Sequence, residues 1–334
     1  MKNKKTTAIL VTGAAARISQ EVACIDKLIE NKGLVINEDN TMLAGFSSGS
    51  LNLLAMNACF RNDNPLSWDS DYKQNMLWNL TNNKVFTPNG IHLPVFDTKP
   101  LRKTLNSFLS QMGVTWYGDL PFDSYVITYS DRKLATEWAN NFQETNQNGL
   151  NASDLFMAST AIPVAFPKQE ISAKEGVDRN FPKGSFIDGG TGGTFKKFED
   201  YIGDYVLENG AFDTLYIVSP MREVGDEDHN NSKPEKGRKI STLEKKSLEQ
   251  FGANHSINAF MKFLEAIKAW ESKNGLLANN IYVSIPKMDS NFGILDFNNE
   301  EEQYNTVCNW LDQNPDQLAV PLDVFIAQHV AVTA

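Results

Sequence analysis

The stretch TMLAGFSSGSLNLLAMNA, residues 41–58, joins two apolar runs through a serine that lies between glycines. The first run, TMLAG, has the length and apolar character of a short buried strand. The second run, SGSLNLLAMNA, is long enough for a mostly buried helix. Between them, Gly-Phe-Ser-Ser-Gly fits the pattern G-x-S-x-G. The stretch therefore predicts a strand, a tight turn and a helix, a unit typical of α/β proteins.

Ser47, at the centre of this pattern, is a candidate nucleophile. A nucleophile elbow requires a strand directly before the serine and a helix directly after it. Gly45 and Gly49 allow the backbone to turn sharply without Cβ clashes. The helix N-terminus directs partial positive charge towards an oxyanion that forms at the serine. An ordinary Ser/Gly loop is the alternative, but both flanks favour the elbow, with Ser48 starting the helix.

A second unit of the same kind comes earlier in the chain. The run TAILVT (7–12) predicts a strand, and a helical apolar pattern follows Gly13 and ends at Gly33. Two strand–turn–helix units indicate an α/β architecture with a mainly parallel sheet. We also expect strands in SYVITYSD, SFIDGG, DTLYIVSP and NNIYVSIP, and helices in PLRKTLNSFLSQMG, ATEWANNF and SINAFMKFLEAIKAWESKNG. No internal repeat or domain boundary is evident, so residues 1–334 are predicted to form one domain with its core over about 6–310.

Composition excludes several functional classes. The net charge is −10, from 31 Lys and Arg against 41 Asp and Glu, which opposes nucleic-acid binding because that requires basic patches. The three cysteines, Cys24, Cys59 and Cys308, match no metal-ligand spacing or disulfide framework and suit a reducing compartment. The N-terminal apolar run is too short for a signal peptide. We therefore expect a cytoplasmic protein, with export by another route as the alternative. We expect no metal or cofactor, because the sequence has no metal-ligand cluster, no G-x-G-x-x-G fingerprint and no Walker-type G-K-[ST].

Two segments differ in character from the rest. Residues 60–92 are polar and Asn-rich, yet they contain Trp68, Leu77 and Trp78. This segment is either a surface insertion with its own apolar anchor or a lid that faces lipid. Residues 223–246 are mostly charged and are predicted to form a mobile loop.

A nucleophilic serine needs a base, and the chain offers two kinds. Its four histidines all lack a context that indicates catalysis: His92, His229, His255 and His329. Asp188 ends the apolar run SFID directly before two glycines. If this strand belongs to the parallel sheet, Asp188 lies at the edge where sites form. A carboxylate whose pKa is raised by burial can act as a general base; the alternative is a simple Asp-Gly turn.

Four segments occur in a meaningful order: TGAAAR (12–17), GFSSGSLNLL (45–54), ASTAIPVAFP (158–167) and DGG (188–190). In this order they resemble the oxyanion loop, the G-x-S-x-G motif, the Ala/Ser segment and the D-G-G motif of the patatin-like phospholipase family. FDTKPLRKTL (96–105) and YVITYSD (125–131) are also similar to family segments. The resemblance covers roughly residues 6–310.

The resemblance implies a three-layer α/β/α sandwich and a Ser-Asp dyad that needs no histidine. Ser47 would be the nucleophile, and Asp188 would be the base in both acylation and deacylation. Arg17 would brace the oxyanion loop, and the alternative is a solvated charge on the helix. The oxyanion donors would be the backbone N–H groups of Gly13, Ala14 and Ala15. The expected activity is hydrolysis of lipid acyl esters, as by a phospholipase A, at a membrane or micelle surface. In such an enzyme the acyl chain would lie in an apolar groove beside Ser47, for which residues 60–92 are a candidate cover.

The chain departs from the family at three places. Its oxyanion loop reads Gly-Ala-Ala instead of a glycine run, and alanine resists positive φ. Ile18 stands where the family usually has glycine, and TGGTFKKF follows where an Asn-Pro segment is common. Two other functions remain alternatives. One is a Ser-Asp-His esterase that uses His255 or His329. The other, which the Ala-substituted oxyanion loop motivates, is a weakly active patatin fold that serves as a lipid-binding or interaction module.

Overall fold

The computed structural model has a mixed sheet at its centre. It describes residues 4–89, 94–142, 149–171, 184–192, 198–220, 257–286, 292 and 295–330. In this part of the chain the sheet has nine strands in the order β11-β10-β9-β1-β2-β5-β8-β7, and β6 also pairs with β5. Its strands are β1 (Thr7–Val11), β2 (Thr41–Gly45), β5 (Asp123–Ser130), β6 (Ala135–Asn140), β7 (Gln169–Ile171), β8 (Gly184–Asp188), β9 (Phe212–Val218), β10 (Ala278–Ser284) and β11 (Val320–Pro321). A separate pair comprises β3 (Thr87–Pro88) and β4 (Phe96–Asp97).

The middle of the sheet is parallel and its margins are antiparallel. Strands β10, β9, β1, β2 and β5 run in one direction. Strand β11 pairs antiparallel with β10, β6 and β8 pair antiparallel with β5, and β7 pairs antiparallel with β8. The mainly parallel sheet expected from the sequence is therefore confirmed.

The prediction of a helix in ATEWANNF is wrong, because Ala135–Asn140 forms strand β6. Six successive residues pair with β5, from Ala135 opposite Ser130 to Asn140 opposite Tyr125. The Trp138 ring packs against Tyr125 on the same face, with centroids 5.9 Å apart. Tertiary pairing and aromatic packing here override a weak local helix preference.

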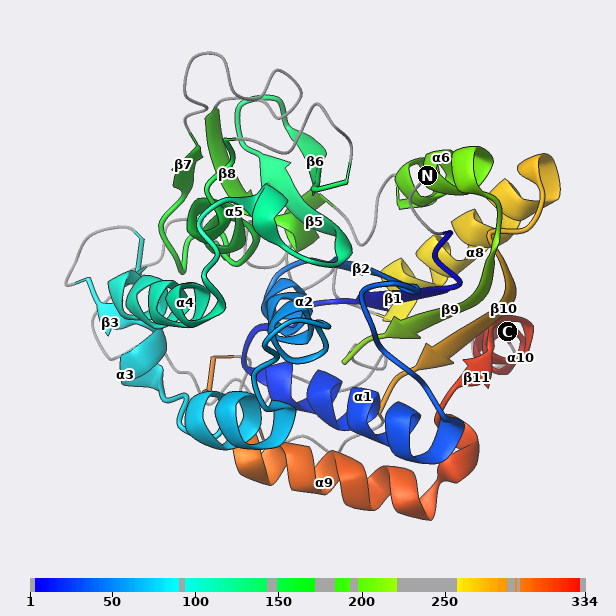
Figure 1. Ribbon diagram of the computed structural model, residues 1–334, viewed down its shortest axis with the longest axis horizontal. Helices are drawn as coiled ribbons and strands as arrows, with labels where there is room; N and C mark the ends of the chain where they lie inside the picture. The colour runs from blue at the N-terminus through cyan, green and yellow to red at the C-terminus, as the bar shows by residue number, and fades with distance from the viewer. Residues whose placement is uncertain are drawn as a thin grey trace.

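Helices cover both faces of the sheet (Figure 1). The α-helices are α1 (Ile18–Lys32), α2 (Ser48–Cys59), α3 (Asn82–Val85), α4 (Lys99–Met112), α5 (Ala152–Ser159), α6 (Phe198–Asn209), α8 (Ile257–Asn274), α9 (Glu300–Gln313) and α10 (Leu322–Val330). Shorter turns are η1 (Ala15–Arg17), η3 (Tyr117–Asp119), η5 (Gly189–Gly192) and η6 (Pro315–Gln317), and η2 (Trp68–Leu77) is a π-helix. Of the helices described, none has the length and apolar character needed to cross a membrane.

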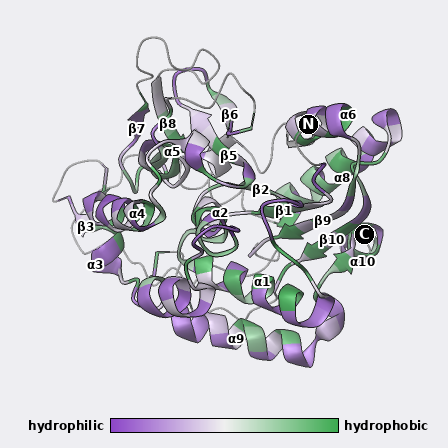
Figure 2. Ribbon diagram, viewed as in Figure 1, coloured by the Kyte–Doolittle hydropathy of each residue, from purple (hydrophilic) through white to green (hydrophobic). Residues whose placement is uncertain are grey.

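Alternation along β1 divides the core into two layers. Ile9 and Val11 belong to the apolar cluster that includes α1 and α2, whereas Ala8 and Leu10 belong to the cluster with α6, α8 and α10. Figure 2 shows hydrophobic residues concentrated on the central strands and hydrophilic residues on the outer surface of α9. Because a strand buried on both faces needs apolar residues at every position, this arrangement confirms the three-layer α/β/α fold.

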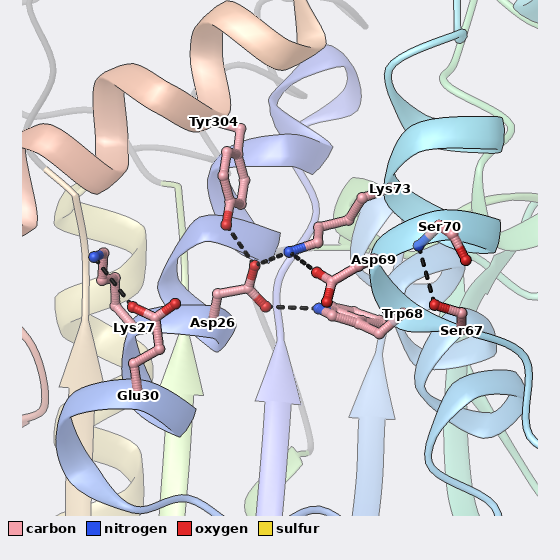
Figure 3. A network of polar contacts seen from close by, with 9 residues as sticks. All are labelled: Asp26, Lys27, Glu30, Ser67, Trp68, Asp69, Ser70, Lys73 and Tyr304. Atoms are coloured by element: carbon pink, nitrogen blue, oxygen red, sulfur yellow. Dashed lines mark hydrogen bonds and ion pairs between the residues drawn. The ribbon is translucent and has the colours of Figure 1, made fainter.

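The polar insertion at 60–92 is attached to the domain by a buried ion pair (Figure 3). Lys73 Nζ lies 2.6 Å from Asp26 Oδ2, and both side chains are buried. Trp68 Nε1 and Tyr304 OH donate to the same carboxylate, each at 2.6 Å. The insertion therefore has an anchor on α1 and α9, while its residues 90–92 and the predicted loop at 223–246 lie outside the described residues.

Candidate active site

Ser47 occupies the sharp turn between β2 and α2. Its backbone has φ 51° and ψ −133°, a conformation that a non-glycine residue adopts only under constraint. Its N–H donates to the Ser159 carbonyl oxygen at 3.0 Å. A Cβ at Gly49 would lie 2.2 Å from the Val11 carbonyl oxygen, and one at Gly45 would lie 2.8 Å from the Gly49 carbonyl oxygen. Both glycines are therefore needed because other backbone approaches them closely.

Asp188 lies at the end of β8 and is completely buried. Its Oδ1 accepts the Gly190 N–H at 2.9 Å. Burial raises the pKa of Asp188 from 3.8 to about 7, although interactions with the Ser47 hydroxyl and the Gly190 N–H lower it. Among the described residues, Asp188 Oδ2 has no hydrogen-bond partner. This is compatible with a role as base, because contacts between a base and its nucleophile often tighten only when substrate binds. The side chain can therefore accept a proton near neutral pH.

Asp188 reaches Ser47 by a different route from the one that the sequence suggested. Strand β8 runs antiparallel to β5, with Asp188 opposite Thr128. Strand β2 pairs with the earlier part of β5 and ends with Gly45 opposite Val126. Because β6 occupies the other edge of β5, β8 and β2 share one edge and point towards each other. The sequence led us to expect Ser47 and Asp188 at the carboxyl ends of two parallel strands, and this is wrong. Strands β2 and β8 instead meet end to end, which brings the two side chains together.

The loop at 13–15 lies against the nucleophile. A Cβ at Gly13 would lie 2.2 Å from the Ser47 Cβ, so only glycine fits there. Ala15 has φ 51°, the positive angle that alanine disfavours. The Ala14 N–H donates to Ser48 Oγ at 3.0 Å. Among the described residues, no hydrogen bond engages the N–H groups of Gly13 and Ala15. These two N–H groups are therefore free to act as donors, whereas that of Ala14 is engaged.

Arg17 is buried rather than solvated. Its guanidinium Nη1 donates to the carbonyl oxygen of Pro220, just beyond β9, at 3.2 Å. This contact links the start of α1 to a strand on the far side of β1 from β2. Its position fits a brace for the preceding loop.

An apolar cavity of about 30 Å³ adjoins Ser47. Ile162 and Phe166, from the Ala/Ser segment, line it together with Leu80 of the insertion. A second apolar cavity of about 20 Å³ and an open groove of about 740 Å³ also have Leu80 in their walls. Leu80 therefore separates the space beside Ser47 from the groove at the surface.

The one histidine among the described residues is remote from this site. His329 lies on α10 and stacks on Phe325, with ring centroids 4.1 Å apart. Helix α10 directly follows β11, which β10, β9 and β1 separate from β2. His92, His229 and His255 lie outside the described residues.

Sequence reasoning missed Glu21, a fully buried acid whose carboxylate contacts Ser48 and Asn52. Ile18, Val22 and Ile25 mark the apolar face of α1, and Glu21 lies on that same face. A charged residue on an otherwise apolar helix face is the signal that could have identified it.

Part of the chain is similar to a known protein family. Residues 33–196 match the family model described as patatin-like phospholipase, a range that includes Ser47 and Asp188. Among solved structures, VipD from Legionella pneumophila matches at 12% identity and a TM-score of 0.33, over 92% of this chain and 67% of that chain. No curated protein matches the sequence.

Proposed function

We propose that the chain is a serine acyl hydrolase that cleaves lipid acyl esters with Ser47 and Asp188, in line with the match of residues 33–196 to the patatin-like phospholipase model. The observation that carries this proposal is a buried carboxylate with a free oxygen next to a serine on a strained turn. Both features cost folding free energy. Such costs are typical of functional sites.

In the proposed reaction Asp188 accepts the Ser47 hydroxyl proton while Oγ attacks the ester carbonyl carbon. The resulting oxyanion would be stabilised by the N–H groups of Gly13, Ala15 and Ser48, the last at the start of α2. When the tetrahedral intermediate collapses, the ester C–O bond breaks and the leaving alcohol takes the proton from Asp188. A water molecule then gives a proton to Asp188 and attacks the acyl-enzyme. Release of the fatty acid returns the proton to Ser47.

The acyl chain would occupy the apolar space beside Ser47. The cavity beside Ser47, about 30 Å³, has room for about two water molecules, since one water needs about 10–15 Å³ of such space. It is therefore far smaller than an acyl chain. Binding therefore requires the wall that includes Leu80 and Val85 to open. Both residues belong to the 60–92 insertion, which we propose is a lid that carries its own apolar anchor.

A non-catalytic lipid-binding module is the second candidate, favoured by the state of the oxyanion loop. The Ala14 N–H is engaged by Ser48 and Ala15 is strained, so fewer donors are free than in a glycine loop. This candidate predicts lipid binding without turnover.

A fluorophosphonate probe, which reacts with activated serines, tests the proposal. We expect the folded wild type to be labelled and Ser47→Ala to lose the label. Asp188→Asn should lower turnover of a short soluble ester and of micellar phospholipid by at least about 100-fold. Asp154→Asn is the control, because Asp154 only pairs with Arg102 at a partly exposed site.

Two results would contradict the dyad. One is labelling that survives Ser47→Ala. The other is loss of turnover on replacing a single histidine with glutamine while Asp188→Asn remains active. Lipid binding by folded wild type without any labelling would instead favour the non-catalytic module.

A further inference from the structure

A chain of buried polar contacts leads from the oxyanion loop to Glu21, a residue without a role in the proposed reaction. The Ala14 N–H donates to Ser48 Oγ at 3.0 Å, and this hydroxyl lies 3.1 Å from Glu21 Oε1. Asn52 Nδ2 donates to Glu21 Oε2 at 2.5 Å. Glu21 and Asn52 are fully buried and Ser48 nearly so. Burying such groups is costly, and here each contact satisfies one of them.

The same chain continues into the insertion. Tyr72, on η2, donates its hydroxyl to Asn52 Oδ1 at 2.5 Å, and it is also buried. Asn52 donates further to the Ile18 carbonyl oxygen at 3.1 Å, at the start of α1. Continuous contacts therefore join the segment proposed as a lid to the loop proposed as the oxyanion hole.

The loop needs such support because of its alanines. Ala15 is held at φ 51°, which for a residue with a Cβ costs about 1–2 kcal/mol. A strained residue persists only when its surroundings over-determine its conformation. The adjacent Ala14 is fixed through its N–H by Ser48, and Glu21 fixes the rotamer of that serine.

We propose that Glu21 is a positioning residue for the oxyanion hole: through Ser48 it holds Ala14 and the strained Ala15, and through Asn52 and Tyr72 it links the hole to the 60–92 insertion. The inference rests on the proposed function. Glu21 would touch neither substrate nor the reacting atoms. Its effect would be to keep the free N–H groups of Gly13 and Ala15 aimed at the oxyanion.

The chemistry of Glu21 allows a conservative variant. Burial raises the pKa of Glu21 well above its usual value, despite the contacts with Asn52 and Ser48, and Glu300 raises it further. A neutral carboxyl accepts with one oxygen and donates with the other. The Ser48 hydroxyl donates to Glu21 Oε1 in the structure, but a hydroxyl can rotate and accept instead. Glutamine can therefore accept from Asn52 and donate to Ser48 Oγ, whereas leucine can do neither.

Kinetics with a short soluble ester test the proposal. We expect Glu21→Leu to lower kcat about 10- to 100-fold, because misplaced oxyanion donors cost that order of rate, while KM changes less than about twofold. Glu21→Gln should retain kcat within about threefold. Because glycine needs no support at positive φ, the loss from Glu21→Leu should be at least about threefold smaller when Ala15→Gly is also present.

Two buried tyrosines provide a matched pair. Tyr72→Phe should lower kcat several-fold, because it breaks the link to Asn52. Tyr117→Phe should leave kcat unchanged, since the Tyr117 hydroxyl donates instead to the Ser124 carbonyl oxygen, outside this chain of contacts.

Amide hydrogen exchange adds a readout that does not depend on activity. Glu21→Leu should speed exchange of the Ala14 N–H at least about tenfold and leave β2 unchanged, whereas Glu21→Gln should keep the wild-type rate. Unchanged Ala14 exchange in Glu21→Leu would overturn the proposal, as would equal losses of kcat with Ala15 and with glycine at that position. If wild type hydrolyses no ester, the proposed function fails, and the exchange rates still decide the positioning role.

Discussion

Replacing Ala15 with glycine should leave the free energy of unfolding nearly unchanged, whereas Ala16→Gly should lower it. The two alanines are adjacent in η1 and both are buried, with exposed fractions of 5% and 0%. They differ in backbone conformation, because Ala15 has φ 51° and Ala16 does not have a positive φ. The pair therefore isolates the strain of the alanine loop from the loss of a methyl group.

Three contributions determine how much each substitution changes the free energy of unfolding. Each substitution removes one buried methyl group, a loss of about 0.8 kcal/mol. Each also gives the unfolded chain more backbone freedom, a loss of about 0.5–1 kcal/mol. Ala16→Gly should therefore lose about 1.5 kcal/mol. At Ala15 the relief of left-handed strain returns about 1–2 kcal/mol, so the net change should be close to zero.

Urea unfolding followed by tryptophan fluorescence and by circular dichroism measures both variants. We expect the Ala15→Gly midpoint to match the wild type and the Ala16→Gly midpoint to fall, with equal slopes in all three proteins. An equal loss of stability in both variants would refute the strain at Ala15.

Four further predictions concern the dyad, the anchor and the lid. Because burial raises the pKa of Asp188 to about 7, kcat/KM for a soluble ester should rise with pH through about 7 and then level off. A profile that is flat between pH 5 and 8 would contradict the role of Asp188 as the base. The folded pKa of Asp188 exceeds its unfolded value, so the stability that it contributes below about pH 4 is lost as pH rises through about 7, by on the order of 4 kcal/mol. Asp188→Asn should thus unfold at higher urea than wild type at pH 8 but not at pH 4, and equal effects at both pH values would exclude the shift. Lys73→Met should lower the free energy of unfolding by about 3 kcal/mol, because it leaves Asp26 buried without its cation. Lys27→Met should lower it by under about 1 kcal/mol, because the partners of Lys27, Glu30 and Asp312, are exposed. Similar losses for both variants in urea unfolding would argue against the anchor. Leu80→Ala should raise kcat/KM several-fold for long-chain esters relative to short ones, because it opens the wall between the cavity beside Ser47 and the surface groove. An unchanged ratio of the two kcat/KM values would argue against entry of the acyl chain past Leu80.

Local sequence was sufficient to predict those features that depend on neighbouring residues in the chain. The strand–serine–helix unit around Ser47 was predicted from a run of 18 residues, 41–58, because its apolar periods and glycines act over a few residues. The end of α1 at Gly33 was predicted for the same reason, and Gly33 has φ 67° in the left-handed region. The α/β architecture with a mainly parallel sheet followed from the order of such units, whereas the three-layer sandwich was implied by the family resemblance.

Tertiary structure decided what depends on partners distant in the chain. Residues 135–140 became a strand because β5 offered a pairing edge, and β8 met β2 end to end because β6 already occupied the other edge of β5. Local sequence also could not indicate that Ser48 engages the Ala14 N–H or that Glu21 contacts Ser48. Hydrophobic period is a local property, whereas strand pairing, burial of a carboxylate and the aim of an N–H group arise only when separate segments are packed together.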